Sequence, residues 1–443
     1  MRWSNSTVTK LNRLAASWPI LLISIAAILS WRCYSYLVAP ELRAEDGRHI
    51  FAYFYEHRRL AALIRFKSGY IPFLPNLLGF LAVRLPARAT PYFLTIVPTL
   101  LTLAVLSVQR TSAYRLFLAS DAHRFCLCLG LALAHIGNHF TVCHTDYSIW
   151  NALLLLMLLS LLPMPRSWPR ALPFGMILVV LCWSHPLSIL ALPPTLLWLW
   201  RDRGVLQRGG HALVAISQLT HVWFGTEPHR AAIAKGSEPL WSQLTALAGG
   251  VLNHLCRGVL RPTIFPWGPA TAEFDYALAA VFIGMVLACA LLPKEPLATR
   301  AFYAWVGYGW ACPMTLIAFA RAERGLQSVR YHYVSKAFAA IALCLVLLQI
   351  LTFLVRRWST RFTALGALPV LGTLLYFVAM NESVGGLSGY RLSDPENSRR
   401  VATFFSELAE AERIQGGHCN IRLSCHKGRG DWSFAIDTRR HCD

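Results

Sequence analysis

The sequence predicts an all-α membrane protein whose helices cross the bilayer many times. Of its 443 residues, 55% are hydrophobic and only 14% are charged, whereas a soluble chain usually carries about a quarter charged residues. The apolar residues gather in runs, and a run of about 20 residues is enough for a helix to cross a bilayer. Much of the positive charge lies in short loops between these runs, as in loops that set membrane topology. We therefore expect a bundle of about eleven transmembrane helices.

The predicted transmembrane helices follow from the apolar runs in chain order. The runs lie at 18–38, 90–109, 124–138, 148–163, 173–185, 187–200, 211–225, 274–293, 301–320, 336–356 and 363–380. The fifth and sixth runs come from one stretch, which could form a single long helix. His185-Pro186 lies in its middle, and proline breaks or kinks a helix. We therefore predict two short helices that meet at a turn near Ser184–Pro186, with a structural role for His185.

The basic residues predict the orientation of the bundle. The N-terminal tail carries Arg2, Lys10 and Arg13 and no acid, so we expect it in the cytoplasm. Alternating crossings then place these segments outside: 39–89, 139–147, 226–273, 321–335 and the tail 381–443. Segment 39–89 carries eight Lys or Arg, against the tendency of basic loops to remain inside. We interpret these cations as functional.

The overall charge of the chain also bears on its partners. Lys and Arg number 42 against 22 Asp and Glu, a net charge of +20. In a soluble protein this excess would suggest nucleic acid. Here the basic residues lie in short loops, where they would contact anionic lipid headgroups. No basic-aromatic module typical of nucleic-acid binding appears. The expected partner is the lipid bilayer, and no nucleic acid.

The chain divides into a transmembrane module, 1–380, and a small extracytoplasmic tail, 381–443. In the tail, Val401, Phe404, Phe405 and Leu408 recur at helical spacing and predict an amphipathic helix. The stretch "CNIRLSCHKGRGDWSFAI" then predicts a short hairpin. Because the tail is too small for an independent enzyme, chemistry is expected in the loops of the membrane module.

Segment 39–89 opens with two adjacent acids, Glu45 and Asp46, just after the first apolar run. Sugar transfer needs a carboxylate that takes the proton of an acceptor hydroxyl. Two neighbouring acids at a low-dielectric surface can differ in proton affinity, which suits one of them to that role. The alternative is structural, because Asp46 could instead cap a helix that begins near Gly47.

Two amphipathic stretches follow these acids and predict helices that lie in the membrane interface. They read "RHIFAYFYEHRRLAALIRF" and "SGYIPFLPNLLGFLAVRLPAR" and mix aromatic residues with cations such as Arg65 and Arg84. Such cations could hold the phosphate of a lipid-linked sugar, as Lys and Arg do for phosphates generally. The alternative is ordinary contact with lipid headgroups.

In this segment the chain resembles the polyprenyl-phosphate-dependent glycosyltransferases of the GT-C superfamily. That group includes aminoarabinose transferases and protein O-mannosyltransferases. The resemblance rests on the first-loop acid, the two interfacial helices and "AEDGRHIFAYF…SGYIPFLPNLLGFL", which is similar to bacterial members. It implies a GT-C-like bundle in a bacterial inner membrane, with an active site facing the periplasm. It also implies an inverting transfer of sugar from a polyprenyl-phosphate donor to a lipid or glycan acceptor.

The resemblance also assigns roles to residues of this sequence. Asp46 would be the base, with Glu45 assisting, and Tyr70 of the Gly-Tyr-x-x-x-x-Pro segment would contact substrate. Asp146, in the second outer segment, would position the acceptor across the cavity from Asp46. The candidate contacts for the leaving phosphate are Arg330 in the late outer segment, and after it Lys67 or Arg84. The other candidate substrate contacts are His144 beside Asp146, and Tyr331 and His332 beside Arg330.

Two further features of the outer segments leave alternatives open. His139, His144 and Asp146 could hold a divalent cation, since imidazole and carboxylate suit zinc or manganese, or could be polar residues at the interface. No cofactor is otherwise predicted. Segment 226–273 is long enough to be a lid over the donor site, or it packs passively.

Two other classes of function compete with the transferase. A flippase or transporter of lipid-linked saccharides would usually place ionisable residues within its spanning helices. Here the acids concentrate in the outer segments, which favours surface chemistry. A glycan polymerase would share the outer-facing site, and the sequence separates it poorly from the transferase. A nucleotide-sugar enzyme is disfavoured, because no phosphate-cradling glycine loop appears.

Overall fold

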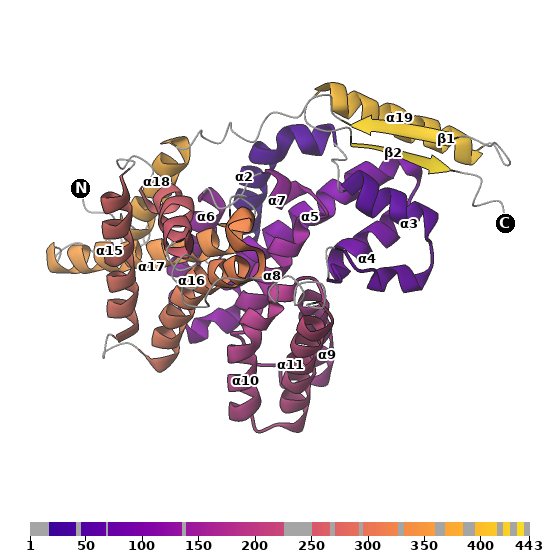
Figure 1. Ribbon diagram of the computed structural model, residues 1–443. Helices are drawn as coiled ribbons and strands as arrows, with labels where there is room; N and C mark the ends of the chain where they lie inside the picture. The colour runs from indigo at the N-terminus through magenta and orange to yellow at the C-terminus, as the bar shows by residue number, and fades with distance from the viewer. Residues whose placement is uncertain are drawn as a thin grey trace, which may run out of the picture.

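The computed structural model describes residues 17–40, 46–67, 70–134, 139–225, 250–265, 271–291, 296–326, 332–358, 368–383, 395–413, 420–425 and 432–437. This part of the chain is predominantly helical, which confirms the predicted class, and it ends in one antiparallel strand pair (Figure 1). The two strands form the hairpin predicted for the tail.

Each predicted apolar run contains a helix. These helices are α2 (Trp18–Val38), α5 (Thr90–Ser107), α6 (Asp121–Leu133), α8 (Ser148–Leu159), α9 (Trp168–Cys182), α10 (Leu192–Arg201), α11 (Val205–Gly225), α15 (Ala272–Leu291), α16 (Leu297–Leu326), α17 (Tyr333–Trp358) and α18 (Leu368–Ser383). Short 3-10 pieces extend some of them: η4 (Val108–Arg110) and η5 (Ser112–Leu116) after α5, and η6 (Pro186–Ala191) before α10.

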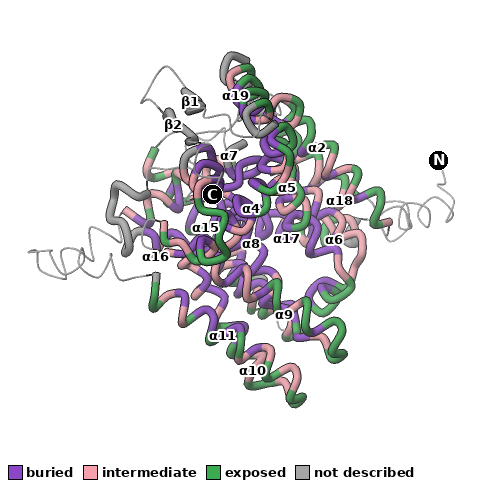
Figure 2. Tube along the Cα trace, turned by 90° about the vertical axis from the view of Figure 1, so that its right-hand side faces the viewer, coloured by how far each residue is buried: buried purple, intermediate pink, exposed green. Residues whose placement is uncertain are grey.

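Within the described residues, three helices are long and apolar enough to cross a membrane. They are Trp18–Val38, Ala87–Leu116 and Tyr333–Val355. Shorter apolar helices include Ser148–Leu159 and Trp168–Cys182. Large apolar side chains are nevertheless exposed along the outer helices α9, α10 and α11, where Figure 2 marks many residues as exposed. Exposed apolar faces of this extent mark a surface that meets lipid or another apolar partner. The count of about eleven crossings stays a prediction.

The predicted break at Pro186 is confirmed. Helix α9 ends at Cys182, and His185 has an extended backbone, with φ −151° and ψ 134°. The His185 Nδ1 atom accepts a hydrogen bond from the Leu187 amide at 3.0 Å, so this histidine caps η6. Its role is structural, as predicted, because the cap satisfies an amide that would otherwise lack a helical partner.

Helix α6 is shorter than the apolar core of a bilayer, and Arg32 of α2 donates hydrogen bonds to the carbonyls at its C-terminal end. Thirteen residues extend about 20 Å, whereas the apolar core of a bilayer is about 30 Å thick. The buried Arg32 guanidinium donates to the carbonyls of Ala132 at 2.7 Å, Leu133 at 2.7 Å and Ala134 at 3.3 Å. These carbonyls have no partner inside the helix, and a cation at this end also matches the helix dipole.

Replacing Arg32 with methionine is therefore expected to destabilise the protein by about 2 kcal/mol, because carbonyls bonded to a charged donor would become unpaired in apolar surroundings. Thermal unfolding in detergent measures the effect. Arg32→Lys should be intermediate, since it keeps one charged donor. Tyr34→Phe, on the exposed side of the same helix, is the control and should match the wild type. An Arg32→Met protein as stable as the wild type would contradict this capping role.

The first predicted interfacial helix is broken into pieces. It forms the π-helix η1 (Asp46–Ala52), α3 (Tyr53–Glu56) and the 3-10 helix η2 (Leu60–Ile64). The break lies at His57, whose ring stacks on Tyr53 and shares a hydrogen bond with the Tyr53 carbonyl at 2.9 Å. A side chain bonded to a helix carbonyl competes with the backbone ladder. The second predicted helix forms α4 (Phe73–Ala82), and η3 (Ala87–Ala89) follows it.

The tail packs against segment 39–89 and forms a second hydrophobic core with it. The amphipathic helix α19 (Pro395–Arg413) buries its predicted apolar face, Val401, Phe404, Phe405 and Leu408, against Ile50, Phe51, Phe54, Phe80 and Leu94. Strands β1 (Asn420–Cys425) and β2 (Trp432–Asp437) pair with Leu423 opposite Phe434. In Figure 1 these tail elements lie beside α3. The tail and segment 39–89 thus occupy one end of the molecule, which is compatible with the predicted orientation.

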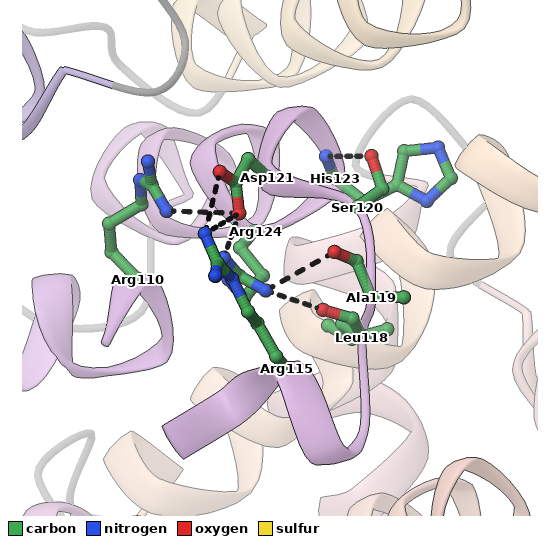
Figure 3. Close-up of polar contacts among 8 residues, drawn as sticks. All are labelled: Arg110, Arg115, Leu118, Ala119, Ser120, Asp121, His123 and Arg124. Atoms are coloured by element: carbon green, nitrogen blue, oxygen red, sulfur yellow. Dashed lines mark hydrogen bonds and ion pairs between the residues drawn. The ribbon is translucent and has the colours of Figure 1, made fainter. Parts of the chain in front are cut away.

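A charged cluster lies at the start of α6, and Figure 3 shows how its side chains converge on one carboxylate. Asp121 is paired with Arg110 at 3.5 Å, with Arg115 at 3.2 Å and with Arg124. The fully buried Arg124 also donates to the Leu118 carbonyl at 2.7 Å. Burial raises the pKa of Asp121, but the Arg115 hydrogen bond and the charges of the three arginines outweigh it, so the pKa is lowered overall.

Candidate functional site

The structure brings Asp46 into contact with the second predicted outer segment. One Asp46 oxygen, Oδ2, lies 2.8 Å from His144 Nδ1, and the other, Oδ1, accepts a hydrogen bond from the Asp146 amide at 2.8 Å. Asp46 is only 3% exposed. One carboxylate oxygen thus accepts from a backbone amide, and the other shares a hydrogen bond with the imidazole. Asp46 thus joins two segments that lie about a hundred residues apart, and its bonds are not those of a helix cap.

Lys67 completes a four-residue cluster, which we call the Asp46 cluster: Asp46, Lys67, His144 and Asp146. The Lys67 ammonium is paired with the Asp146 carboxylate, and these side chains are 16% and 11% exposed. Lys67 also forms a backbone bridge with Tyr70, through hydrogen bonds of 2.7 and 3.1 Å. Two predicted substrate contacts, Lys67 and Tyr70, are therefore held next to each other, and the ion pair is the most accessible part of the cluster.

Buried polar side chains position the two segments that carry the cluster. Asn76 of α4 donates to the Leu63 and Arg65 carbonyls at 3.0 and 3.1 Å, just before Lys67. Arg65 donates to the His49 carbonyl at 2.8 Å and lies over the Tyr53 ring. Burial lowers the pKa of Arg65, and the charges of Tyr53 and Asp146 partly oppose that shift. Segment 46–67 is thereby folded back on itself, so that Asp46 and Lys67 meet the same partner segment.

The second segment is fixed by α5, α8 and α17. The short helix α7 (His139–Cys143) precedes it, and the Thr145 hydroxyl donates to the Leu94 carbonyl at 2.7 Å. Asn151 of α8 donates to the Thr141 carbonyl at 2.6 Å and accepts from the Tyr333 hydroxyl at 2.5 Å. The His144 ring packs edge-on against Tyr36. Asn151 therefore links the first turn of α17 to α7, the helix just before His144 and Asp146.

Other predicted site residues are placed apart from this cluster or are not described. Glu45, Arg330 and Tyr331 lie outside the described residues. The Arg84 guanidinium donates to the Phe80 carbonyl and, at 3.1 Å, to the Arg58 carbonyl, so it ties the end of α4 to the segment after α3. His332 is buried against the π-helix η7 (His254–Leu260), where a Cβ on Gly258 would lie 2.5 Å from its ring.

The cation hypothesis rests on residues that the structure describes only in part. The His139 side chain lies outside the described residues, the His144 Nδ1 atom contacts Asp46, and the Asp146 carboxylate is paired with Lys67. In the described part of the chain, no group of three or more His, Cys, Asp or Glu is arranged to hold a metal ion.

Sequence reasoning missed a second buried carboxylate, Asp275, at the start of α15. Its Oδ2 atom is 3.0 Å from Arg257 Nε, and its Oδ1 atom has no hydrogen-bond partner among the described residues. An acid at the first turn of a long apolar helix, with a basic residue in the preceding loop, was the available signal. Residues 226–249 and 266–270 of the predicted lid, 226–273, lie outside the described residues. The rest contributes η7 and α14 (Arg261–Ile264).

Comparisons with protein-family models, with curated proteins and with solved structures gave no match. The molecule is thus defined by its own features. It is a predominantly helical chain with three helices long and apolar enough to cross a membrane, among the residues described. It buries a carboxylate–histidine–carboxylate–lysine cluster where segments 46–67 and 144–146 meet.

Proposed function

We propose that the chain is an inverting glycosyltransferase of the GT-C type, with about eleven membrane crossings. It would move a sugar from a polyprenyl phosphate to a lipid or glycan acceptor on the outer face of a bacterial inner membrane. One observation carries the proposal: Asp46, His144, Asp146 and Lys67 come together from two predicted outer segments. A buried carboxylate beside a histidine and a lysine–carboxylate pair is suited to moving a proton next to a phosphate.

In the proposed reaction, Asp46 takes the proton from the acceptor hydroxyl. The acceptor oxygen then forms a bond to the anomeric carbon of the sugar, and the bond from that carbon to the phosphate oxygen breaks. The electron pair of the broken bond stays on the leaving polyprenyl phosphate. A lysine near the developing charge stabilises it, and Lys67 is the described cation closest to this role. His144 orients Asp46, and Asp146 positions the acceptor.

Substrates must displace a neighbour to reach Asp46, because this residue is 3% exposed. The Lys67–Asp146 ion pair is the more exposed part of the cluster. A donor phosphate would compete with the Asp146 carboxylate for Lys67, since both are anions that accept hydrogen bonds from an ammonium group. Release of Asp146 would free its carboxylate for the acceptor hydroxyl, so donor binding would prepare the acceptor site.

The proposal is tested with purified protein, a radiolabelled pool of polyprenyl-phosphate sugars and membrane lipid. We expect labelled product together with free polyprenyl phosphate. Lys67→Gln should raise the donor KM about tenfold or more, because a charged hydrogen bond to phosphate is lost. Arg84 was also a predicted phosphate contact, but its guanidinium is bonded to the Phe80 and Arg58 carbonyls. Arg84→Gln is therefore the matched control and should leave the donor KM near the wild-type value.

Two results would contradict the proposal. Movement of the labelled lipid across sealed vesicles without cleavage of the sugar–phosphate bond would identify a flippase or transporter. Release of long chains from one donor pool without any added acceptor would identify a polymerase. Equal donor KM values for Lys67→Gln and the wild type would show that Lys67 does not bind the donor phosphate. The transferase proposal would then depend on the role of Asp46 alone.

A further inference from the structure

A cavity of about 560 Å³ lies apart from the Asp46 cluster, where the tail helix α19 meets the adjoining ends of α2 and α5. Its lining comes from three stretches: Val38, Ala39 and Pro40 at the end of α2; Arg88, Pro91 and Tyr92 at the start of α5; and Arg399, Val401, Ala402, Phe405 and Ser406 on α19. No residue of the Asp46 cluster lines it. The cavity is large enough for a lipid headgroup with its phosphate, because ligand pockets begin near about 300 Å³.

The lining of this cavity combines cationic and apolar groups. Arg88 and Arg399 are its charged residues, and no acid lines it among the described residues. Both arginines are exposed, so their charges are available to a ligand. Most of the remaining lining is apolar, with the Tyr92 and Ser406 hydroxyls as further hydrogen-bonding groups. Arginine suits a phosphate ligand, because each planar guanidinium can donate two parallel hydrogen bonds to two phosphate oxygens.

Apolar surface continues from the cavity along the two helices that form its floor. Helices α2 and α5 pack against each other, and both are of membrane-spanning length. Each carries a stripe of exposed apolar or aromatic side chains at helical spacing, which therefore shares one face of its helix. The stripes are Trp31, Tyr34 and Val38 on α2, and Tyr92, Ile96 and Leu100 on α5. Both stripes end at the cavity, in Val38 and Tyr92.

We propose that this cavity binds the headgroup of an anionic phospholipid, with the phosphate between Arg88 and Arg399 and the acyl chains along the α2 and α5 stripes. Charge complementarity selects an anionic occupant, and the continuous apolar stripes select a lipid over a free anion. Binding would fasten the tail to the membrane, because Arg399 belongs to α19 and Arg88 to η3, directly before α5. The proposal does not depend on the transferase assignment.

The test is native mass spectrometry of the full-length protein in detergent, titrated with phosphatidylglycerol or with phosphatidylcholine of the same acyl chains. The wild type should bind phosphatidylglycerol preferentially. Arg88→Gln/Arg399→Gln should weaken that binding about 30-fold, because each basic residue at an anionic lipid surface contributes roughly fivefold. Arg170→Gln/Arg203→Gln removes the same charge from exposed positions outside the cavity. This control should bind as the wild type does.

Two further variants keep the result interpretable if the glutamine variant folds poorly. Arg88→Lys/Arg399→Lys keeps the charge and should retain most of the preference. Ala402→Trp fills the cavity with both arginines in place and should reduce phosphatidylglycerol binding. Equal binding of the two lipids by the wild type would overturn the proposal. So would wild-type binding by both the glutamine variant and Ala402→Trp. Full displacement of the lipid by inorganic phosphate would reassign the cavity to a free anion.

Discussion

Replacing Asp46 with asparagine is expected to lower the rate of glycosyl transfer by about 10²- to 10⁴-fold, the contribution of a positioned general base. Asparagine has the same shape, and its carbonyl can still accept the hydrogen bond of the Asp146 amide. Its amide can face His144 if the imidazole changes tautomer. The fold should therefore survive while the base is lost, and transfer rate and thermal unfolding are measured on the same preparation.

The control for this prediction is Glu56→Gln, an acid of the same segment at the end of α3, which should keep the wild-type rate. Glu45→Gln decides between the two adjacent acids. If Glu45→Gln is inactive and Asp46→Asn is active, the base is Glu45 and the function stands with a different residue. If both variants transfer sugar at the wild-type rate, the proposed mechanism is wrong.

Replacing Asp121 with asparagine is expected to destabilise the protein by about 3 kcal/mol, the lower end for removing one partner of a buried ion pair. We expect the lower end of the usual range of about 3–5 kcal/mol, because the Asp121 side chain is 29% exposed. The loss arises because Arg124 and Arg110, whose side chains are 0% and 5% exposed, would be left without their counterion. Thermal unfolding in detergent measures it.

The matched control is Arg115→Gln, on the exposed side of the same cluster, where the side chain is 60% exposed. A surface ion pair contributes at most about 1 kcal/mol, so this variant should be close to the wild type. If Asp121→Asn and Arg115→Gln are equally stable, the cluster is not a buried counterion site, and the excess positive charge there is simply solvated.

Asp121 also makes the stability of the folded protein depend on pH. The pKa of Asp121 is lower in the folded protein than its ordinary value. Its contribution to stability is therefore fully present above the ordinary aspartate pKa of about 4, and it is lost as the pH falls through the folded-state value. Acidification below that range should reduce the stability difference between the wild type and Asp121→Asn. A difference that is constant down to strongly acidic pH would contradict this.

The helices of the bundle could be predicted because their signals are local. The apolar run at 336–356 predicted α17, and Pro186 predicted the break between α9 and η6. Both depend on contacts within a few residues, where side-chain spacing and proline sterics decide the outcome. The spacing of Val401, Phe404, Phe405 and Leu408 likewise predicted an amphipathic helix. It did not reveal that the apolar face packs on segment 39–89 instead of on lipid.

The candidate site was predicted only in part. Asp46 and Asp146 were expected to lie across a cavity from each other, and the structure has them in contact through the Asp146 amide. The pairing of Lys67 with Asp146 and the contact of His144 with Asp46 were not expected. Lys67 and Asp146 lie 79 residues apart in the sequence. A salt bridge between residues so far apart leaves no periodic pattern in a single sequence. The same holds for Asp275, whose burial follows from the packing of η7 against α15.

By itself, the sequence determined that this chain is predominantly helical, that some of its helices are long and apolar enough for a membrane, and where proline divides them. The reason is that hydrophobic periodicity and backbone sterics act between near neighbours. Only the tertiary structure decided that Arg32 caps the C-terminal end of α6, that the tail packs on segment 39–89, that His144 contacts Asp46, and that Lys67 pairs with Asp146. Those features depend on burying distant groups together, since an unpaired polar group in an apolar interior is costly. That cost is set by the packed fold.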